Sequence, residues 1–403
     1  MDIIYNNNVD DVIKTEAIMK TLKLVMEGLP HFKDKIELNF VAQQRVNDYD
    51  KERLHHAFSN IYVNKAISFV GVNASGKTTI LKAVSFVMKM LNNESLNNIE
   101  SKTIFDELDE KQQVRVTSYF YNDRDVCKLE TVIGKGVNKV DGSEKLVICD
   151  ETLWAKESTK VKTKKGLFEF SNSDLKAKRD KNAQYLMEDV SIIVAENKRE
   201  NMVLSLYDML EWTDHNMLNV LGKFPKELLT FLDPSIEYLE CILKEKKVDI
   251  HLKFYGKEEI IMNSLDVLEN YLSSGTIKGL GVFMAATFSF IEGGYLIIDE
   301  IENHFNQEIV ATLLRFFLDA KVNKNGATII FSTHYSELLD EFDRNDGIYI
   351  VRNKNGIGVE NLANLLKRND IKKSEIYDSD YLGGTVPAYD AYMALKKVLG
   401  HIR

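Results

Sequence analysis

The sequence predicts an α/β protein built around a mixed sheet with helices on its faces. A short apolar run at 66–71 is followed by a glycine-rich turn and by apolar residues at helical spacing as far as residue 91. The last third alternates strand and helix patterns, with strands expected at 295–298, 327–332 and 347–351 and helices at 307–319 and from 333 through 342. Strand–helix–strand alternation is typical of a parallel sheet covered by helices.

Composition bounds the class of protein. The 403 residues are 44% apolar and 28% charged, the profile of a globular chain with a real core. The net charge of −9 does not favour general electrostatic attraction to nucleic acid, although it leaves room for local basic patches. The 3 cysteines, Cys127, Cys149 and Cys241, lie too far apart for a disulfide framework or a metal-binding spacing. We expect a cytoplasmic protein with no membrane contact, because no signal-peptide pattern opens the chain and the longest uncharged stretch, 279–291, is too short to span a bilayer.

The rest of the chain predicts further elements. Two strands are expected at 22–26 and 35–40, around a turn at Pro30. Antiparallel strands are expected at 114–121, 129–133 and 146–148, a mostly helical stretch at 185–232 and a strand at 248–254.

The glycine-rich turn at 71–78 reads Gly-Val-Asn-Ala-Ser-Gly-Lys-Thr and fits the pattern G-x-x-x-x-G-K-[ST] without a mismatch. It follows an apolar strand and opens a helix, which is the context that a phosphate-binding loop requires. Glycines allow the backbone to turn so that its N–H groups face phosphates, Lys77 reaches the β- and γ-phosphates, and Thr78 supplies a hydroxyl to Mg²⁺. The residues expected to bind nucleotide are Gly71, Asn73, Ala74, Ser75, Gly76, Lys77, Thr78 and Thr79.

The apolar strand at 295–298 ends in two carboxylates, Asp299 and Glu300. Nucleotides bind beyond the carboxyl ends of the strands in open α/β sheets. We therefore expect Asp299 to hold Mg²⁺ and Glu300 to polarise the attacking water as a general base. A solvated acidic pair at a strand end is the alternative, which the neighbouring phosphate loop disfavours.

Two weaker signals flank this strand. Ser273-Ser274-Gly275-Thr276 opens an apolar helical stretch, where a helix N-terminus can bind an anion, although an ordinary capping turn has the same sequence pattern. His334 ends the strand at 327–332 and can contact the γ-phosphate, although a lone histidine is more often structural.

In this order and at these spacings, the four motifs resemble those of an ABC-type ATPase: Walker A, signature, Walker B and switch histidine. The signature Ser-Ser-Gly-Thr, in place of Ser-Gly-Gly-Gln, resembles that of OLD-like and abortive-infection AAA-type ATPases, which are related to the RecF and SMC ATPases. Asp299-Glu300-Ile301-Glu302-Asn303 followed by His304 resembles their extended Walker B, and residues 380–387 resemble their C-terminal segment.

The resemblance implies a role for each matching residue. Thr78 and Asp299 bind Mg²⁺, Glu300 is the catalytic carboxylate and His334 the switch histidine, with Lys77 contacting the phosphates. Ser273, Ser274, Gly275 and Thr276 contact the γ-phosphate of ATP on an opposing subunit. That implies a head-to-tail, ATP-dependent homodimer or higher homo-oligomer. Gln112 and Gln113 are candidates for the Q-loop glutamine, or exposed turn residues.

The motif spacing also predicts how the chain is divided. An ATPase head is expected from 1–91 and 264–403, with a lobe of 92–263 inserted between Walker A and the signature. Within that lobe we expect a β-rich part at 112–150, a basic loop at 156–181, a helical part at 185–232 and a strand at 248–254. The basic loop carries a local charge of +5, which predicts a solvated loop or a contact for nucleic acid or an acidic partner.

No effector domain is expected in the chain. Asp378-Ser379-Asp380 has the spacing of a nuclease Asp-x-Asp, but only 23 residues follow it. Our first hypothesis is therefore an ATPase that senses or regulates in a bacterial anti-phage system and controls a separate effector, a nuclease or toxin. The alternatives are a RecF/SMC-like repair ATPase acting on DNA, and a slow nucleotide-gated assembly scaffold.

Overall fold

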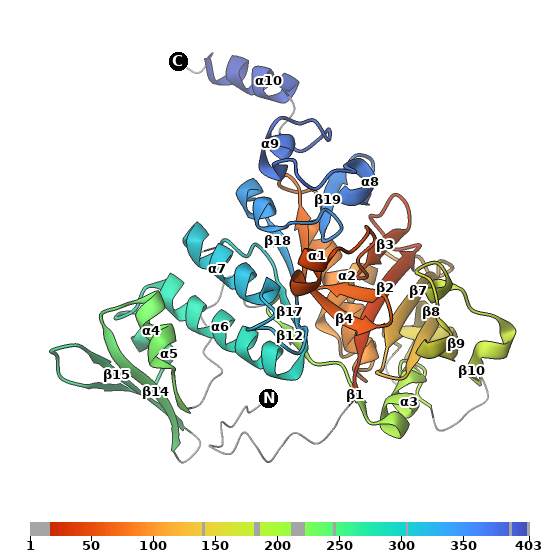
Figure 1. The fold of residues 1–403 in the computed structure, drawn as a ribbon, viewed down its shortest axis with the longest axis horizontal. Coiled ribbons are helices and arrows are strands. Elements are labelled where there is room, and N and C mark those ends of the chain that lie inside the picture. Colours follow the sequence, from red (N-terminus) through yellow and green to blue (C-terminus); the bar gives the residue numbers. More distant parts are fainter. Residues whose placement is uncertain are drawn as a thin grey trace.

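A six-stranded, mostly parallel sheet lies at the centre of the protein (Figure 1). The computed structural model describes residues 17–138, 142–180, 186–210, 222–244, 247–303, 305–386 and 389–400. The strand order is β12-β17-β18-β6-β19-β20, and all neighbours are parallel except β19 and β20. The strands are β6 (Ala66–Val70), β12 (Leu206–Asp208), β17 (Tyr295–Ile298), β18 (Thr328–Thr333), β19 (Ile348–Asn353) and β20 (Ile357–Asn361).

Alternating side chains of this sheet enter two separate cores, as strand geometry requires. Phe69 and Ile297 belong to the core that contains helix α2 (Lys77–Leu91). Val70 and Ile298, one residue further along, belong to the core that contains α7 (Gln307–Leu318) and part of α6 (Ser274–Glu292). The strands predicted from the apolar runs are therefore confirmed, and both of their faces are covered by helices.

A second six-stranded sheet packs on the other side of α2. Its order is β10-β9-β8-β7-β2-β3, and all of its pairs are antiparallel. The expected hairpin around Pro30 and the expected antiparallel strands all belong to this one sheet. Its strands are β2 (Lys20–Glu27), β3 (Ile36–Asn39), β7 (Val114–Tyr121), β8 (Asp125–Val137), β9 (Glu144–Glu157) and β10 (Leu175–Lys178).

A third, four-stranded sheet lies apart from the other two, at the lower left of Figure 1. Its inner face packs with α4 (Lys226–Leu232), α5 (Leu265–Leu268) and one side of α6. Helix α6 is long and apolar enough to cross a membrane by composition, but 56% of its most apolar window is buried within the fold, as in a core helix. The strands are β13 (Gly222–Lys223), β14 (Ile236–Lys244), β15 (Lys247–Phe254) and β16 (Ile260–Met262).

These sheets correct the expected division of the chain. Residues 92–263 do not form one inserted lobe, because β7 to β10 complete a sheet begun by β2 and β3, and β12 pairs with β17. The last part of the segment, from β13 to β16, is the part that forms a sheet of its own. The boundary placed at residue 91 therefore does not separate two structural units.

The prediction of a mostly helical stretch at 185–232 is wrong. Within 185–232, the described residues form α3 (Ile193–Glu200), β11 (Met202–Val203), β12 and β13 before α4 begins. Residues 185 and 211–221 lie outside the described residues. Pairing with β17 draws β12 into the sheet, a tertiary effect that overrides local propensity. The helix expected from 333 through 342 is present as the shorter 3₁₀ helix η6 (Ser336–Glu341).

The basic segment 156–181 is not a solvated loop. Leu167 is fully buried, and β10 pairs with β9. Lys164 donates to three backbone carbonyls of the segment after β3, and the buried Arg179 donates to the carbonyls of Met187 and Val190. Part of the local positive charge is therefore used in holding the segment to the fold.

Shorter elements complete the structure. The C-terminal helix α10 lies away from the rest of the molecule in Figure 1, and none of its residues is buried. The remaining elements are β1 (Ala17–Ile18), α1 (Asp48–Arg53), β4 (Leu54–Phe58), β5 (Ile61–Asn64), η1 (Glu100–Phe105), η2 (Ser158–Lys160), η3 (Gly166–Phe168), η4 (Asn172–Asp174), α8 (Leu362–Leu365), α9 (Lys373–Asp378) and α10 (Tyr389–Gly400).

Candidate functional site

The turn between β6 and α2 has the geometry of a phosphate-binding loop. Gly76 has a φ of 102°, a conformation that residues with a side chain rarely adopt. A Cβ on Gly71 would lie 2.4 Å from the carbonyl oxygen of Val351 on β19. The loop therefore needs glycine at both positions, and it leads directly into the N-terminus of α2, where the helix dipole favours an anion.

Lys77 is buried beneath this loop. Its ammonium donates to the carbonyls of Gly71 (2.9 Å) and Val72 (3.3 Å), and lies 3.3 Å from Nδ1 of His334. Burial lowers the pKa of Lys77, and nearby carboxylates, Asp299 first among them, act in the opposite direction. Because an ammonium group only donates, Nδ1 is the acceptor in this contact. The ring proton of His334 then sits on Nε2.

Asp299 lies at the end of β17 and connects the phosphate loop to β18. Its Oδ2 accepts a hydrogen bond of 2.6 Å from the hydroxyl of Thr78, and its Oδ1 accepts one from the hydroxyl of Ser332. A hydroxyl and a carboxylate oxygen are thus held together at the first turn of α2. Such an all-oxygen pair fits Mg²⁺, which would be held by Thr78 and Asp299.

Glu300 and His334 face each other across the ends of β17 and β18. Nε2 of His334 lies 3.4 Å from Oε1 of Glu300, and the backbone N–H of Glu300 donates to the hydroxyl of Ser332 (2.8 Å). The Glu300 side chain is 46% exposed, which leaves it open to water and substrate. Glu300 has a positive φ of 44°, an uncommon conformation for a residue with a side chain.

Within one chain, Ser273 to Thr276 do not contact Lys77, Asp299 or Glu300 through any hydrogen bond or ion pair of the described residues. Ser273 is the N-cap of α6, and its hydroxyl accepts the backbone N–H of Thr276 (3.0 Å) and lies 2.8 Å from the Thr276 hydroxyl. Further along α6, Lys278 donates to the carbonyl of Asn303 (2.9 Å), in the turn after β17.

Three other sequence predictions have distinct outcomes. Gln112 donates from its side-chain amide to the carbonyl of Gly28 (2.9 Å), in the turn after β2. His304 and Pro387, at the ends of the extended Walker B and C-terminal resemblances, lie outside the described residues. Asp380 accepts the backbone N–H of Thr385 (2.8 Å), and so stabilises a turn.

Sequence reasoning missed Ser332 and Glu302. Ser332 is fully buried and bonds to both residues of the acidic pair, and Glu302 accepts the backbone N–H of His334. Ser332 lies near the end of β18 and Glu302 in the turn after β17, two segments that meet only because the strands pair in the fold. Polar residues at the end of an otherwise apolar strand are the signal that could have singled out Ser332.

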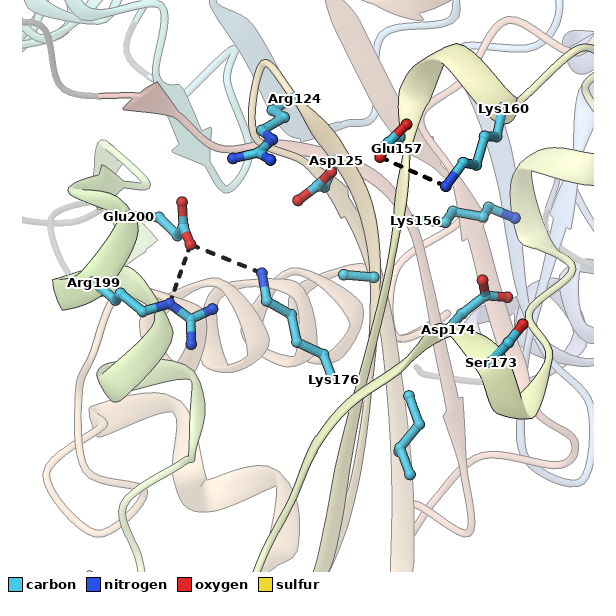
Figure 2. A pocket seen from close by; sticks show the side chains of 12 residues that line it. Arg124, Asp125, Lys156, Glu157, Lys160, Ser173, Asp174, Lys176, Arg199 and Glu200 are labelled. Carbon is cyan, nitrogen blue, oxygen red and sulfur yellow. Dashed lines mark hydrogen bonds and ion pairs between the residues drawn. The ribbon is translucent and has the colours of Figure 1, made fainter.

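A separate pocket of about 430 Å³ lies on the antiparallel sheet, between β8, β9, β10 and α3 (Figure 2). It is lined by charged side chains, several of which pair with each other, such as Arg199 with Glu200 and Lys160 with Glu157. None of the predicted site residues lines it. Three lysines of the basic segment do: Lys156, Lys160 and Lys176.

The strand order and the glycine-rich turn between β6 and α2 are those of an α/β P-loop fold, with the acidic pair at the end of β17. In agreement, residues 250–340 match the family described as "AAA domain, putative AbiEii toxin, Type IV TA system". No curated protein matches the chain. Among solved structures, the chain is similar to "Structure of the recombination mediator protein RecF-ATP in RecFOR pathway", with 12% identity, a TM-score of 0.38, and coverage of 87% of this chain and 100% of that one.

Proposed function

We propose that this chain is a cytoplasmic ATPase that hydrolyses ATP with Mg²⁺ and, through that cycle, regulates a separate effector in a bacterial anti-phage system. The observation that carries the hydrolytic part is the contact set joining Thr78 to Asp299, and Lys77 through His334 to Glu300. These five side chains come from three elements that meet at the carboxyl ends of β6, β17 and β18.

Each of these residues has a separate role in the proposed reaction. The loop at 71–76 and the N-terminus of α2 bind the phosphates, and Lys77 exchanges its carbonyl acceptors for phosphate oxygens. Thr78 and Asp299 hold Mg²⁺, which supplies positive charge to the phosphate oxygens when bound. Glu300 orients and polarises the attacking water, while His334 Nε2–H donates toward the same region.

We also propose an ATP-dependent homodimer. Ser273 to Thr276 lie at the N-terminus of α6, and within the part of the chain that the structure describes their side chains form no hydrogen bond to Lys77, Asp299 or Glu300. A second copy placed head-to-tail would bring these residues to ATP bound at the opposing phosphate loop. Ser274 is exposed, and its position at the start of a 19-residue helix suits contact with an anion.

The regulatory role rests on the family match. The matched family is described as "AAA domain, putative AbiEii toxin, Type IV TA system", and the sequence resembles OLD-like and abortive-infection ATPases. We propose that a separate protein, a nuclease or toxin, is the effector, and that ATP-dependent dimerisation controls it. Co-expression with the product of the neighbouring gene, followed by co-purification with and without ATP, tests the partnership.

The hydrolytic assignment is tested by Glu300→Gln and Lys77→Ala. We expect Glu300→Gln to lower ATP turnover by about 100-fold or more with nucleotide binding retained, because removal of a general base costs about 10²–10⁴-fold. Lys77→Ala should weaken nucleotide binding about tenfold or more. Lys82→Ala, on the same helix, is the matched control and should behave as the wild type. Undiminished hydrolysis in both site variants would contradict the assignment.

DNA binding and slow assembly are the competing functions, and both can be measured. ATP-requiring duplex binding that weakens with salt, and weakens further when exposed lysines such as Lys162 are neutralised, would favour a DNA-repair role. The hydrogen bonds of Lys164 and Arg179 to backbone carbonyls within the fold argue against nucleic-acid contact by these two residues. Mass measurement with and without ATP, together with single-turnover kinetics, distinguishes a cycling ATPase from a scaffold.

A further inference from the structure

Glu302, two residues beyond the acidic pair, carries a carboxylate that the proposed mechanism does not use. Its Oε1 accepts the backbone N–H of His334. Its Oε2 is buried and has no hydrogen-bond partner among the described residues. Burying an unpartnered polar atom costs about 1–3 kcal/mol, and more for a charged one. A stabilising role alone therefore does not account for a glutamate at this position.

The backbone around His334 is held by side chains on either side of it. Glu302 accepts the N–H of His334, and the hydroxyl of Thr333 accepts the N–H of Tyr335 (3.0 Å). With its backbone fixed in this way, the imidazole lies between Lys77 (3.3 Å) and Glu300 (3.4 Å). A rotation of the peptide before His334 would carry the ring away from both contacts.

Glu302 itself is anchored to the strand end that carries the acidic pair. The backbone N–H of Ile301 donates to the carbonyl of Ser332 (3.1 Å), and the N–H of Phe305 donates to the carbonyl of Glu302 (3.0 Å). The segment after β17 is thereby fastened to the end of β18. The negative charge of Glu302 also acts on Lys77, together with those of Asp299 and Glu300.

We propose that Glu302 is a positioning residue for ATP hydrolysis. It holds the backbone of His334 so that the His334 imidazole keeps its contacts with Glu300 and Lys77. The inference rests on the proposed function and extends it to a residue with no direct contact to the reacting atoms. The hydrogen bond from His334 N–H to Glu302 Oε1 connects the two strand ends independently of Ser332. It would persist while Lys77 exchanges its present acceptors for phosphate.

The test compares three substitutions of Glu302 with two control variants. Glu302→Gln keeps an acceptor oxygen for the His334 N–H, Glu302→Met keeps the length but lacks that oxygen, and Glu302→Ala removes the side chain. Glu337→Gln, an exposed residue three positions beyond His334, is the matched control, and Glu300→Gln reports on the site itself. Single-turnover hydrolysis, the Kd for a fluorescent ATP analogue and the melting temperature are measured for each purified full-length variant.

We expect Glu302→Ala and Glu302→Met to lower the single-turnover rate by about tenfold or more, because small displacements of reacting groups are costly. Their Kd for nucleotide should stay within about threefold of the wild type, and Glu302→Gln should retain a rate within about threefold. If Glu302→Ala fails to fold, the single-turnover rates of Glu302→Met and Glu302→Gln are compared to test the proposal.

Two results would overturn the inference. Wild-type rates in Glu302→Met or Glu302→Ala would show that the hydrogen bond does not position His334. A rate in Glu302→Gln as low as that in Glu302→Met would show that charge, rather than the acceptor, matters. If Glu300→Gln is inactive, either of these results contradicts only the role of Glu302. If Glu300→Gln hydrolyses ATP at the wild-type rate, the proposed function itself is contradicted.

Discussion

Replacing Ser332 by alanine removes one hydroxyl that serves both residues of the acidic pair. That hydroxyl donates to Oδ1 of Asp299 and accepts the backbone N–H of Glu300 at 2.8 Å, and Ser332 is fully buried. A hydrogen bond to a charged group contributes about 1.5–3 kcal/mol, and a buried donor left without a partner costs about 1–3 kcal/mol. The two effects overlap, so we expect a loss of about 3 kcal/mol in the free energy of unfolding.

Ser68 supplies a matched control for this change. It lies on β6 opposite Phe331, the residue before Ser332, and it is also fully buried. Its hydroxyl has no hydrogen-bond partner among the described residues, so Ser68→Ala removes an unsatisfied group and should be neutral or stabilising. The difference between the two variants isolates the hydrogen bonds of Ser332 from the general effect of removing a hydroxyl.

The assay is thermal unfolding and ATP turnover of both variants. With an unfolding entropy of about 2 cal/mol/K per residue over 403 residues, a 3 kcal/mol loss lowers the midpoint by roughly 3–4 °C. Turnover of Ser332→Ala should fall by about tenfold, because Asp299 and Glu300 both lose a fixed contact. A Ser332→Ala variant as stable and as active as Ser68→Ala would refute the reasoning.

Two further predictions concern the phosphate loop and a buried lysine. In Gly76→Ala, the new Cβ would lie 2.6 Å from Ile357, so we expect a fluorescence titration to show no nucleotide binding. The control is Gly256→Ala, which shares the positive φ but has no atom within 4 Å of its Cβ. Gly76→Ala should destabilise the fold more than this control. Lys20 donates to three backbone carbonyls, and burial lowers its pKa to about 7 from 10.5. The unfolded chain keeps that proton over this range, so stability measured by urea titration should rise between about pH 7 and 10.5, and should rise less in Lys20→Met.

The strand ends that carry the site could be predicted from the sequence. A fully buried parallel strand is a continuous apolar run, and a polar residue that follows it must lie at the edge of the sheet. The run at 295–298 ends at Asp299, and the run at 66–70 ends at Gly71, and the structure has β17 and β6 over those residues. Thr78 and Asp299, which are 221 residues apart, then meet because both strands pair with β18.

Contacts that depend on register could not be predicted in the same way. Whether the Ser332 hydroxyl reaches Asp299 depends on the strand register. Ile298 pairs with Phe331, so the residues that follow them, Asp299 and Ser332, lie side by side. A shift of one residue would turn the hydroxyl to the other face of the sheet. Apolar runs of this kind carry no signal for register, because each residue in them is compatible with burial on either face.

The expected insertion failed for a related reason, which concerns strand pairing rather than strand position. The alternation of apolar and polar residues identifies β7, β8 and β9 as strands. It does not show that β7 pairs with β2. Leu24 and Met26 on β2 and Val116 on β7 are all buried in the same core as α2, so the hydrophobic face of β2 is completed only by residues that follow in the chain. A head ending at residue 91 would leave β2 and β3 as a two-stranded hairpin, which is marginal in water. That physical requirement, rather than any motif, places 92–178 in the same structural unit as β2, β3 and α2.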